Sequence, residues 1–427
     1  MRTDALRPLA GRRLLIGVSG SIAAVKTPLL VSALVKAGAE VRCVVTPSAA
    51  KLVSPLALAS LSRHRCYEDA DGWDSSCSRP LHIELAEWAE LVVVAPLSAS
   101  SLSRWSQGSA DGLLASVLLA CECPVLAAVA MNTAMWNHPA VQDNWARVKH
   151  FPRVVPLEPA AGLLACDRLG DGRMADPLMI ELAAVSLFSR GQPSPDAKRD
   201  WTGLRLLVTA GPTVEPLDAA RSLSNRSSGA MGVLLAQAAQ LRGADVDLVH
   251  GPLQVPIPWK EALCCHPITS ATDLEAVLKD LQPKADAVAM AAAVADLRRS
   301  IPATSVKEPK ALWLDRLAEG WELVPDLLAG ISARRTNGQC VLGFAALSGD
   351  DETLCRIGED KRQQKGCDLL FANPIDRAGQ GFSEPLNGGW LLAESGPTSL
   401  PVTSKLHLAH QLLDALLGLR PSASTSC

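Results

Sequence analysis

The sequence lacks the features that mark several protein classes. Its 12 cysteines form no CxxC pair and no Cys/His ladder, which disfavours structural zinc and a disulfide framework and fits a reduced setting. It has no long basic run and its net charge is -3, so nothing in it points to nucleic acid or lipid headgroups as partners. Residues 1–13 contain no apolar signal core, and we expect a cytoplasmic protein.

No uninterrupted apolar run is long enough to cross a membrane. The most apolar stretch, residues 112–131, is interrupted by Glu122 and Pro124, which favours a buried helix followed by a buried strand. The chain has 427 residues and 48% of them are hydrophobic. This length and composition predict two or three domains with substantial cores.

Apolar segments alternate with helical patterns in the first half of the chain. They predict strands at 13–18, 40–46, 90–95 and 124–130, and helices at 22–37, 47–60 and 109–121. Continuous apolar strands between amphipathic helices are typical of a parallel sheet covered on both faces. Ligands of such sheets bind beyond the carboxyl ends of the strands, so the loops after these four strands are the candidate site.

The pattern then starts a second time. GLRLLVTAGPT at 203–213 resembles RRLLIGVSGS at 12–21, and RGADVDLVHGP at 242–252 resembles AGAEVRCVVTP at 37–47. We therefore predict an α/β fold with two three-layer domains, 1–190 and 202–420, each a mainly parallel Rossmann-like sheet flanked by helices. The polar, proline-containing segment 191–201 is the expected linker, and 421–427 is an expected tail.

Further elements are expected in the second domain. They are strands at 204–209, 244–249, 285–291, 340–345 and 368–372, helices at 229–241, 272–281 and 351–365, and a hairpin near 387–402.

A Gly/Ser turn, Ser19–Ile22, follows the first strand and opens a helix. Free backbone N–H groups and the helix dipole can hold a phosphate there, although small residues also serve packing alone. The G-x-G-x-x-G fingerprint is absent from both openings, which disfavours a standard NAD site and a Rossmann-type oxidoreductase.

Three other side chains of the first domain could carry chemistry. His82 begins a helix, Asn132 follows the strand at 124–130, and Cys166 lies in the glycine-flanked loop GLLACDRLGDGR. A histidine can act as general acid or base, an amide can orient a carboxylate, and a thiol can donate a proton. Taken singly, each has a structural alternative: a core or capping histidine, a helix N-cap, and an inert buried thiol.

The second domain contains SLSNRSSGAMG at 222–232, in which donors, glycine and arginine coincide ahead of a helix. Arg221 and Arg226 flank Asn225 there, and the combination favours phosphate binding over simple capping. Downstream lie Asp296, at the end of a strand, and Lys307 and Lys310. A lysine near a triphosphate can stabilise charge on the α-phosphate, whereas a lone lysine is more often a solvated surface charge.

Together these motifs resemble the family of bifunctional coenzyme A biosynthesis proteins, in which a phosphopantothenoylcysteine decarboxylase is fused to a phosphopantothenate-cysteine ligase. The resemblance runs from about residue 12 to about 410. GVSGSIAAVKTP, APLSASSL, AMNTAMWNHP and ACDRLGDGRM are similar to the decarboxylase half, and VTAGPTVEPLD, SNRSSGAMG, AAAVADLR and CDLLFANP to the ligase half.

The resemblance implies roles for the first domain. His82 would be the base or orienting acid, Asn132 would hold the substrate carboxylate or amide, and Cys166 would protonate an enethiol intermediate. Met135 would contact the substrate. An FMN site would be lined by Gly20, Ser21, Thr46, Ser98, Ala99, Ser100 and Ala130.

For the second domain it implies CTP-dependent ligation of L-cysteine to 4'-phosphopantothenate, with Mg²⁺ and metal ligands that the sequence does not identify. Asn225 would act on an acyl-cytidylate, Arg221 would contact substrate, and Lys307 would assist acyl-cytidylate formation. CTP would contact Asp296, Lys307, Pro325, Asp326, Phe344, Lys361 and Lys365. The family also implies a homo-oligomer with flavin sites between subunits.

The chain departs from the family pattern at a few positions. Asp167 follows Cys166 where glycine is usual, Glu87 and Leu347 replace a basic and an acidic residue, and Lys310 rivals Lys307. Asp167 and Leu347 motivate an alternative with only one competent half. A third reading is an FMN-binding regulatory or interaction protein, against which His82, Asn132 and Cys166 argue together.

Overall fold

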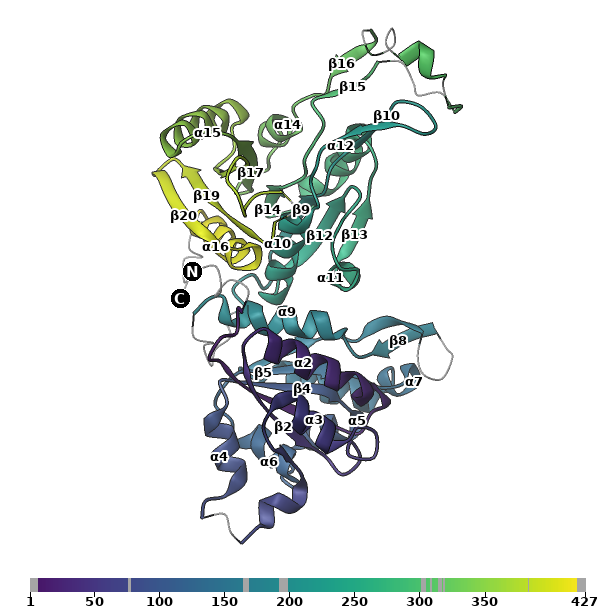
Figure 1. The fold of residues 1–427 in the computed structure, drawn as a ribbon, viewed down its shortest axis with the longest axis vertical. Coiled ribbons are helices and arrows are strands. Elements are labelled where there is room, and N and C mark those ends of the chain that lie inside the picture. Colours follow the sequence, from purple (N-terminus) through teal and green to yellow (C-terminus); the bar gives the residue numbers. More distant parts are fainter. Residues whose placement is uncertain are drawn as a thin grey trace. The chain divides into compact units, whose positions relative to one another are not determined.

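We analysed a computed structural model of the chain. It describes residues 7–75, 78–163, 169–191, 199–300, 305–307, 309–313, 317, 319–382 and 384–420. The chain divides into two compact units, Met1–Lys198 (unit 1) and Arg199–Cys427 (unit 2). Each unit is described by itself (Figure 1).

Unit 1 is built on a six-stranded sheet in the order β3-β2-β1-β4-β5-β6, and all its pairs are parallel. β1 and β4 are almost entirely buried, as expected of Leu/Val/Ile-rich strands covered on both faces. The strands are β1 (Arg13–Val18), β2 (Glu40–Val45), β3 (Cys66–Tyr67), β4 (Leu91–Leu97), β5 (Val125–Val129) and β6 (Val154–Leu157).

Helices cover both faces of this sheet, which confirms the predicted three layers for unit 1. On one face α2 (Thr27–Lys36) packs against α3 (Pro55–Ser62) and α9 (Pro177–Phe188). On the other face a single core cluster joins four helices. These are α4 (Leu81–Trp88), α5 (Ala99–Gln107), α6 (Leu113–Ala120) and α8 (Pro139–Lys149). Short turns of helix, η1 (Ile22–Lys26), η2 (Asp69–Trp73) and α7 (Thr133–Trp136), complete the unit.

A separate antiparallel hairpin, β7 (Ala160–Leu163) and β8 (Leu169–Arg173), projects from unit 1. Cys166 and Asp167 lie between its strands and are outside the described residues.

Unit 2 has an eight-stranded sheet in the order β13-β12-β9-β14-β17-β18-β19-β20. Only the pairs β18–β19 and β19–β20 are antiparallel, so the sheet is mainly parallel, as predicted. The strands are β9 (Arg205–Ala210), β12 (Asp245–His250), β13 (Cys264–Pro267), β14 (Ala287–Met290), β17 (Cys340–Leu347), β18 (Leu369–Pro374), β19 (Leu386–Ala393) and β20 (Gly396–Ser404).

The sheet of unit 2 is also sandwiched between helices. On one face α10 (Ala230–Leu241) packs against α11 (Pro258–Glu261) and α16 (Lys405–Gly418). On the other, one core cluster unites α12 (Ala271–Leu281), α14 (Leu327–Ala333) and α15 (Asp351–Lys365) with the strands. The 3-10 turn η3 (Gln282–Lys284) follows α12.

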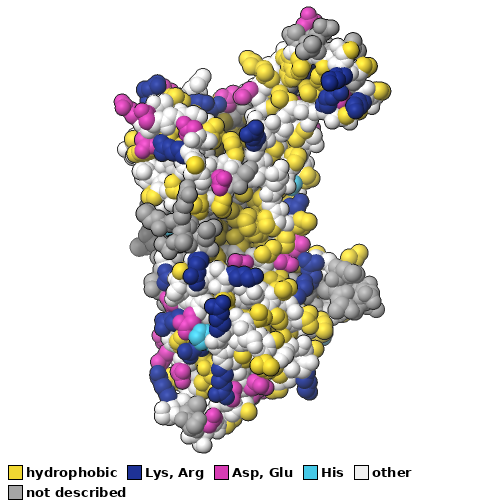
Figure 2. Space-filling model, viewed as in Figure 1, with side chains coloured by type: hydrophobic (Ala, Val, Ile, Leu, Met, Phe, Trp, Pro, Cys, Tyr) yellow, Lys and Arg dark blue, Asp and Glu magenta, His cyan; other side chains and the backbone are white. Residues whose placement is uncertain are grey.

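An arm extends away from this sandwich (Figure 1). It consists of two short antiparallel ribbons, β10 (Val214–Pro216) with β11 (Ser222–Ser224) and β15 (Leu297–Arg299) with β16 (Trp321–Leu323), and the 3-10 turn η4 (Lys310–Leu312). On the face shown in Figure 2, Lys and Arg side chains are interspersed with Asp and Glu in both units.

Several predicted boundaries were wrong for local reasons. The helix expected at 22–37 is the 3-10 turn η1 followed by α2, which has a proline in its first turn. The helix expected at 47–60 begins only at Pro55. The segment after β4, predicted to be a loop, is the N-terminus of α5, because the Ser98 hydroxyl accepts a hydrogen bond from the Ser101 amide as a helix cap.

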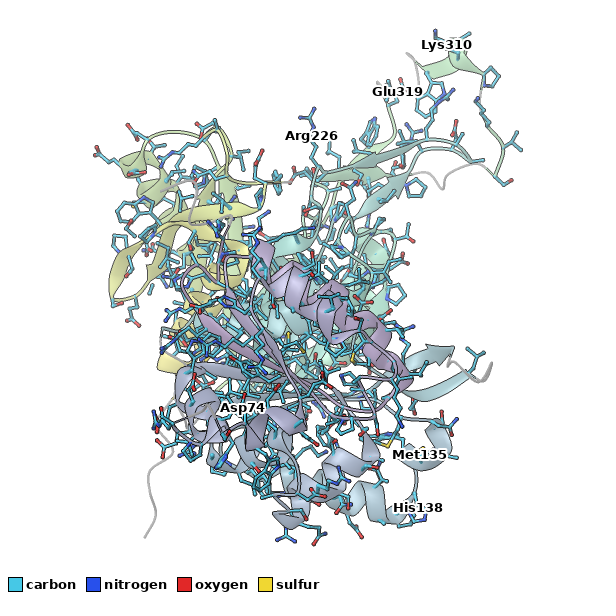
Figure 3. All side chains as sticks on the ribbon, turned by 60° about the horizontal axis from the view of Figure 1, so that its bottom comes forward. Asp74, Met135, His138, Arg226, Lys310 and Glu319 are labelled. Carbon is cyan, nitrogen blue, oxygen red and sulfur yellow. The ribbon has the colours of Figure 1, made fainter. Side chains whose placement is uncertain are left out.

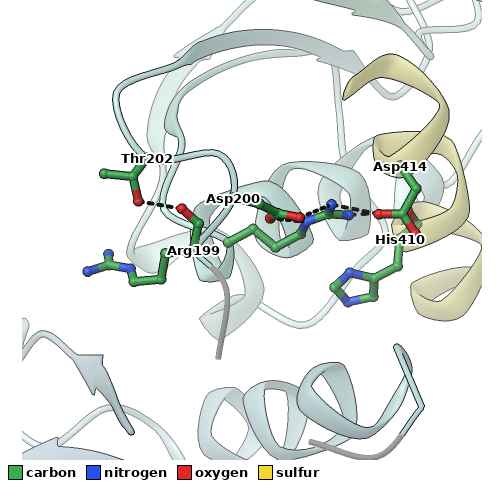
Figure 4. Close-up of polar contacts among 6 residues, drawn as sticks. Arg199, Asp200, Thr202, His410 and Asp414 are labelled. Atoms are coloured by element: carbon green, nitrogen blue, oxygen red, sulfur yellow. Dashed lines mark hydrogen bonds and ion pairs between the residues drawn. The ribbon is translucent and has the colours of Figure 1, made fainter. Parts of the chain in front are cut away.

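A buried arginine fastens the start of unit 2 to its last helix (Figure 4). The Arg242 guanidinium donates two hydrogen bonds to the Asp200 carboxylate, at 2.9 and 2.7 Å, and one to Asp414 at 2.6 Å. It also donates to the His410 carbonyl, and its side chain is 3% exposed. Asp200 and the fully buried Trp201 therefore pack within unit 2, although the sequence placed them in the linker.

Arg242→Met should lower the free energy of unfolding of unit 2 by about 2 kcal/mol, since it removes the hydrogen bonds that the guanidinium donates to Asp200 and Asp414; the loss is below that of a fully buried pair because Asp414 is half exposed. Urea-dependent hydrogen exchange of unit 2 peptides measures the change. Arg356→Ala, which breaks only the exposed pair with Asp360, is the control and should cost under about 0.5 kcal/mol. Equal losses in the two variants would contradict the assignment.

Candidate functional site

The carboxyl edge of the unit 1 sheet is held together by a buried hydroxyl. Ser19, which follows β1, is fully buried. Its Oγ donates to the Pro96 carbonyl at 2.8 Å and accepts from the Ser98 amide at 2.7 Å. The ends of β1 and β4 are therefore tied directly, which brings the Gly20–Ser21 turn beside the Ser98–Ser100 helix start.

Both of these segments begin a helix at this edge. Ser21 caps η1 and Ser98 caps α5, so first-turn amides lie beside both caps. Gly20 is exposed, and a Cβ added to it would lie 2.5 Å from the Ser48 Cβ. Gly20 thus lets the turn after β1 approach the loop after β2 closely.

Thr46 and Ala130 occupy the ends of the neighbouring strands. The Thr46 amide bonds the Val18 carbonyl, and the Ala130 amide bonds the Leu97 carbonyl. Thr46 also lines a hollow with Ser101 and Arg104 of α5. All the residues that the sequence assigned to a cofactor in this unit lie after β1, β2, β4 or β5.

Asn132 stands at the base of the β7–β8 hairpin. Its Oδ1 accepts from the Ala134 amide at 2.8 Å and caps α7. The Met131 amide bonds the Gly172 carbonyl, and Thr133 Oγ1 donates to the Asp171 carbonyl at 2.6 Å. The strand that follows the Cys166 segment is therefore pinned to the residues on both sides of Asn132.

Met135 lies on α7 and is 49% exposed. Figure 3 shows it projecting near His138, which begins α8. Apolar and uncharged, it offers contact area rather than polar recognition.

His82 lies in the first turn of α4 and is half-buried. α4 packs against α6 and η2, whereas α7 packs against β8 and α8. Within one chain His82 and Asn132 are thus carried by elements with different neighbours. The nearby Glu87 is exposed and paired with Arg79 at 2.6 Å, so its charge is locally balanced.

In unit 2, Asn225 joins two loops at the carboxyl edge. Its Nδ2 donates to the carbonyls of Ala293 and Val294, at 3.2 and 3.0 Å, while the residue itself is exposed. The amide N–H groups of Asn225 therefore position its side chain, and its carbonyl oxygen is left to interact with a ligand.

Two buried threonines support the same loop after β14. Thr209 Oγ1 accepts from the Ala292 amide and Thr213 Oγ1 from the Ala295 amide, each at 3.0 Å. Sequence inspection did not single out these residues. Their only signal was a hydroxyl residue in and just beyond an apolar strand.

The segment Ser227–Gly229 leads into α10. Both serine hydroxyls accept hydrogen bonds from amides two residues ahead, and Gly229 adopts a φ of +78°. A Cβ at Gly229 would lie 2.2 Å from a methyl group of Leu253 and 3.1 Å from the Gly211 amide nitrogen. Glycine is required here because the backbone turns left-handed against its neighbour.

Arg221 is engaged inside the unit. It pairs with the buried Asp218 at 3.0 Å, and its guanidinium lies 4.6 Å from the centre of the Trp313 ring. These contacts hold Arg221 in the turn between β10 and β11, against Trp313, which follows η4.

A chain of contacts continues from Asp296 to α15. The Val324 amide bonds the Asp296 carbonyl, which places Pro325 and Asp326 next to Asp296. Asp326 caps α14 and its Oδ2 lies 2.7 Å from the Lys365 Nζ. Lys361 lies one turn before Lys365 on α15. The structure therefore brings most of the predicted triphosphate residues to one edge.

Burial raises the pKa of Asp326, but the Ala329 amide and the Lys365 ammonium outweigh this effect and hold that pKa below its usual range. The carboxylate is therefore ionised at neutral pH, and the local charge of the Asp326–Lys365 pair is balanced.

Phe344 and Leu347 lie on β17 and differ in accessibility. Phe344 is half-buried and packs edge-on against Phe371, with ring centres 5.8 Å apart. Leu347 is 8% exposed and belongs to the core cluster. Its side chain therefore packs in the core with α14 and α15.

Lys307 and Lys310 are exposed and lie in the arm. Figure 3 shows Lys310 and Glu319 at the outer end of the arm, with Arg226 set well back from them. Lys310 is therefore set apart from Arg226, the neighbour of Asn225.

The Asp326–Lys365 pair generates a pH-dependent prediction. Because the folded pKa of Asp326 is depressed, its contribution is present above the unfolded value of about 3.9 and is lost as pH falls through the folded pKa. Asp326→Asn should therefore reduce the free energy of unfolding by under about 1 kcal/mol at pH 7, since the side chain is 42% exposed. Urea denaturation should show that this difference shrinks as the pH falls below about 3.9. A difference that grows on acidification would contradict the ion pair.

Among the described residues, no helix is long and apolar enough to cross a membrane. Two family models match the chain: Flavoprotein over residues 3–186 and DNA/pantothenate metabolism flavoprotein C-terminal domain over 201–419.

Curated relatives match over nearly their whole length. The Coenzyme A biosynthesis bifunctional protein CoaBC of Escherichia coli K12 is 36% identical over 96% of this chain and 97% of that protein. That of Mycobacterium tuberculosis H37Rv is 38% identical over 95% and 96%.

Solved structures match one unit at a time. A PPC decarboxylase mutant complexed with pantothenoylaminoethenethiol is 35% identical over 42% of this chain and 99% of its own, with a TM-score of 0.39. The C-terminal domain of a CoaBC protein is 28% identical over 51% and 98%, with a TM-score of 0.41. Because it matches these curated relatives over nearly its whole length, the chain belongs to the family of bifunctional coenzyme A biosynthesis proteins.

Proposed function

We propose that the two units catalyse consecutive reactions of coenzyme A biosynthesis. Unit 2 would join L-cysteine to 4'-phosphopantothenate at the expense of CTP. Unit 1 would decarboxylate the resulting 4'-phosphopantothenoylcysteine to 4'-phosphopantetheine. The observation that carries this proposal is the contact chain from Asn225 through Asp296 to Asp326 and Lys365, on a chain whose family is bifunctional.

Unit 1 has a suitable cradle for FMN. Two helix starts, at Ser21 and Ser98–Ser100, present amides to a phosphate, and Gly20 leaves room for close approach. Thr46 and Ala130 would border the same ligand. When bound, FMN supplies the oxidation that makes loss of CO2 from the cysteinyl group feasible.

The protein's own side chains would bind the substrate and move protons. Asn132 would hold the substrate carboxylate at the N-terminus of α7, with Met135 against the chain of the substrate. Cys166, whose following strand is bonded to the loop around Asn132, would return a proton to the product. His82 would act as base or orienting acid.

A homo-oligomer with flavin sites between subunits fits two features of unit 1. Ile22, Val25 and Leu29, beside the Gly20–Ser21 turn, are 55%, 53% and 66% exposed. Three neighbouring apolar side chains left in water favour burial against another surface. His82 and Asn132 also lie on elements with different neighbours, as expected if each site draws on two subunits.

In unit 2 the first step would be attack of the phosphopantothenate carboxylate on the α-phosphate of CTP, with loss of pyrophosphate. Cysteine nitrogen would then displace CMP. Lys361 and Lys365, together with Mg²⁺, would balance the triphosphate charge. Asn225 would use its carbonyl oxygen at the acyl-cytidylate, and Lys307 on the arm would assist its formation.

The direct test is to incubate the purified protein with 4'-phosphopantothenate, CTP, Mg²⁺ and L-cysteine. The proposal predicts pyrophosphate, CMP, CO2 and 4'-phosphopantetheine. Phosphopantothenoylcysteine that accumulates without CO2 would remove the decarboxylase, and absence of pyrophosphate would remove the ligase.

Gly20→Ala should weaken flavin binding at least about tenfold, equivalent to about 1.4 kcal/mol, because the new methyl group must displace the Ser48 loop next to Thr46. Flavin fluorescence titration of the stripped protein measures this. Gly418→Ala, where a Cβ meets nothing within 4 Å, should bind flavin normally. Unchanged binding in both variants would refute the location of the cradle.

Asn225→Ala should lower the ligase kcat about a hundredfold or more, a typical cost of removing one oriented polar group from a reacting centre, while decarboxylation of supplied phosphopantothenoylcysteine persists. Pyrophosphate release and CO2 release give the two rates. Ser222→Ala, in the strand β11 that precedes Asn225 and exposed, is the matched control. A parallel loss of both activities in Asn225→Ala would indicate misfolding instead.

A further inference from the structure

The outer edge of the unit 2 sheet carries a sulfur, a nitrogen and an oxygen on one face. Cys264 and His266 are alternate residues of the edge strand β13, so their side chains share a face. Asp247 of β12 is the register partner of Cys264. The three potential ligand atoms all lie within 4.8 Å of one another.

The imidazole nitrogen of His266 lies between the carboxylate oxygen of Asp247 and the sulfur of Cys264. His266 Nε2 is 2.8 Å from Asp247 Oδ1 and 3.6 Å from Cys264 Sγ. One proton on that nitrogen serves one linear hydrogen bond. A cation at the centre of the three would bond all of them at once.

The spacing suits a tetrahedral ion. Zn–S and Zn–N bonds of about 2.3 and 2.05 Å place the two ligand atoms about 3.6 Å apart, which is the Cys264–His266 separation found here. The carboxylate oxygen and the imidazole nitrogen would separate to about 3.4 Å on the same geometry, a shift that a rotation of the Asp247 carboxylate provides.

The cluster is accessible to solvent. The side chains of His266 and Asp247 are 30% and 22% exposed, and Cys264 is exposed, so water can reach a fourth position. Asp247 is the register partner of Cys264, and Val249 is that of His266. The group therefore lies along the outermost pair of strands, on residues other than those proposed for the ligase reaction.

We propose that Asp247, Cys264 and His266 form a binding site for Zn²⁺ or a similar thiophilic divalent ion, with water as the fourth ligand. A thiolate and an imidazole select such ions over Mg²⁺ and Ca²⁺, which prefer oxygen ligands. Within the described part of the chain, β13 pairs with β12 alone (Figure 1), so the ion would cross-link the outermost strand of the sheet to its neighbour.

Cobalt provides a direct readout in the full-length, reduced and chelator-treated protein. Titration with Co²⁺ should produce a thiolate-to-cobalt charge-transfer band and tetrahedral d–d bands, and an equimolar addition of Zn²⁺ should bleach them. Excess Mg²⁺ should leave them unchanged.

Variants assign the ligands. Cys264→Ser should abolish the charge-transfer band, and Asp247→Asn and His266→Ala should each weaken Co²⁺ binding at least tenfold. Cys265→Ser, which removes the neighbouring thiol on the opposite face of β13, should retain the wild-type spectrum. Circular dichroism and ligase activity report folding, and Asp247→Asn, which preserves side-chain shape, tests the site if another variant is unstable. A wild-type spectrum in Cys264→Ser, or wild-type Co²⁺ affinity in His266→Ala and Asp247→Asn, would overturn the proposal.

Discussion

All parallel strands of a sheet end at the same edge, and the position of the candidate site in each unit depends on this constraint. Because each connection between parallel strands crosses back over one face of the sheet, the loops after neighbouring strands meet at that edge with backbone amides available. In unit 1 the Ser19 hydroxyl ties the ends of β1 and β4. In unit 2 the Asn225 amide ties the segment after β11 to the loop after β14. One side chain thus holds each edge in shape.

The two edges share geometry and differ in charge. The unit 1 edge offers small residues, two helix starts and uncharged side chains such as Asn132 and Met135, which suits a bound cofactor that brings its own reactivity. The unit 2 edge offers Asp296, Asp326 and Lys365, which suits a triphosphate and charge developing on phosphorus. The same sheet architecture therefore supports two different reactions, as function resides in the residues at the edge rather than in the fold.

The sequence predicted the long apolar strands of both sheets, because continuous apolar runs are local signals. The short strands β3, β6, β7, β8, β10, β11, β13, β15 and β16 were not predicted, since they contain no such run. The resemblance assigned Asp296, Asp326 and Lys365 to one site, and in the structure the Val324 amide bonds the Asp296 carbonyl while Asp326 pairs with Lys365. The sequence did not predict the roles of individual side chains. The Asn225 amide donates its hydrogen bonds to backbone carbonyls, the Ser19 hydroxyl ties two strand ends together and does not serve to bind a ligand, and Leu347 packs in the core. Those outcomes depend on contacts between segments far apart in the chain. The positions of Lys307 and Lys310 depend on the arm, for which apolar periodicity carries no signal.

The central claim is that the two units hold separate sites that act in sequence, and mixing two crippled proteins tests it most directly. Asn225→Ala should lack ligation and Cys166→Ser should lack completed decarboxylation, so neither alone should convert 4'-phosphopantothenate to 4'-phosphopantetheine. An equimolar mixture should form 4'-phosphopantetheine, after a lag in which free phosphopantothenoylcysteine builds up. A mixture as inactive as its components, with both proteins folded and flavin-loaded, would contradict the account.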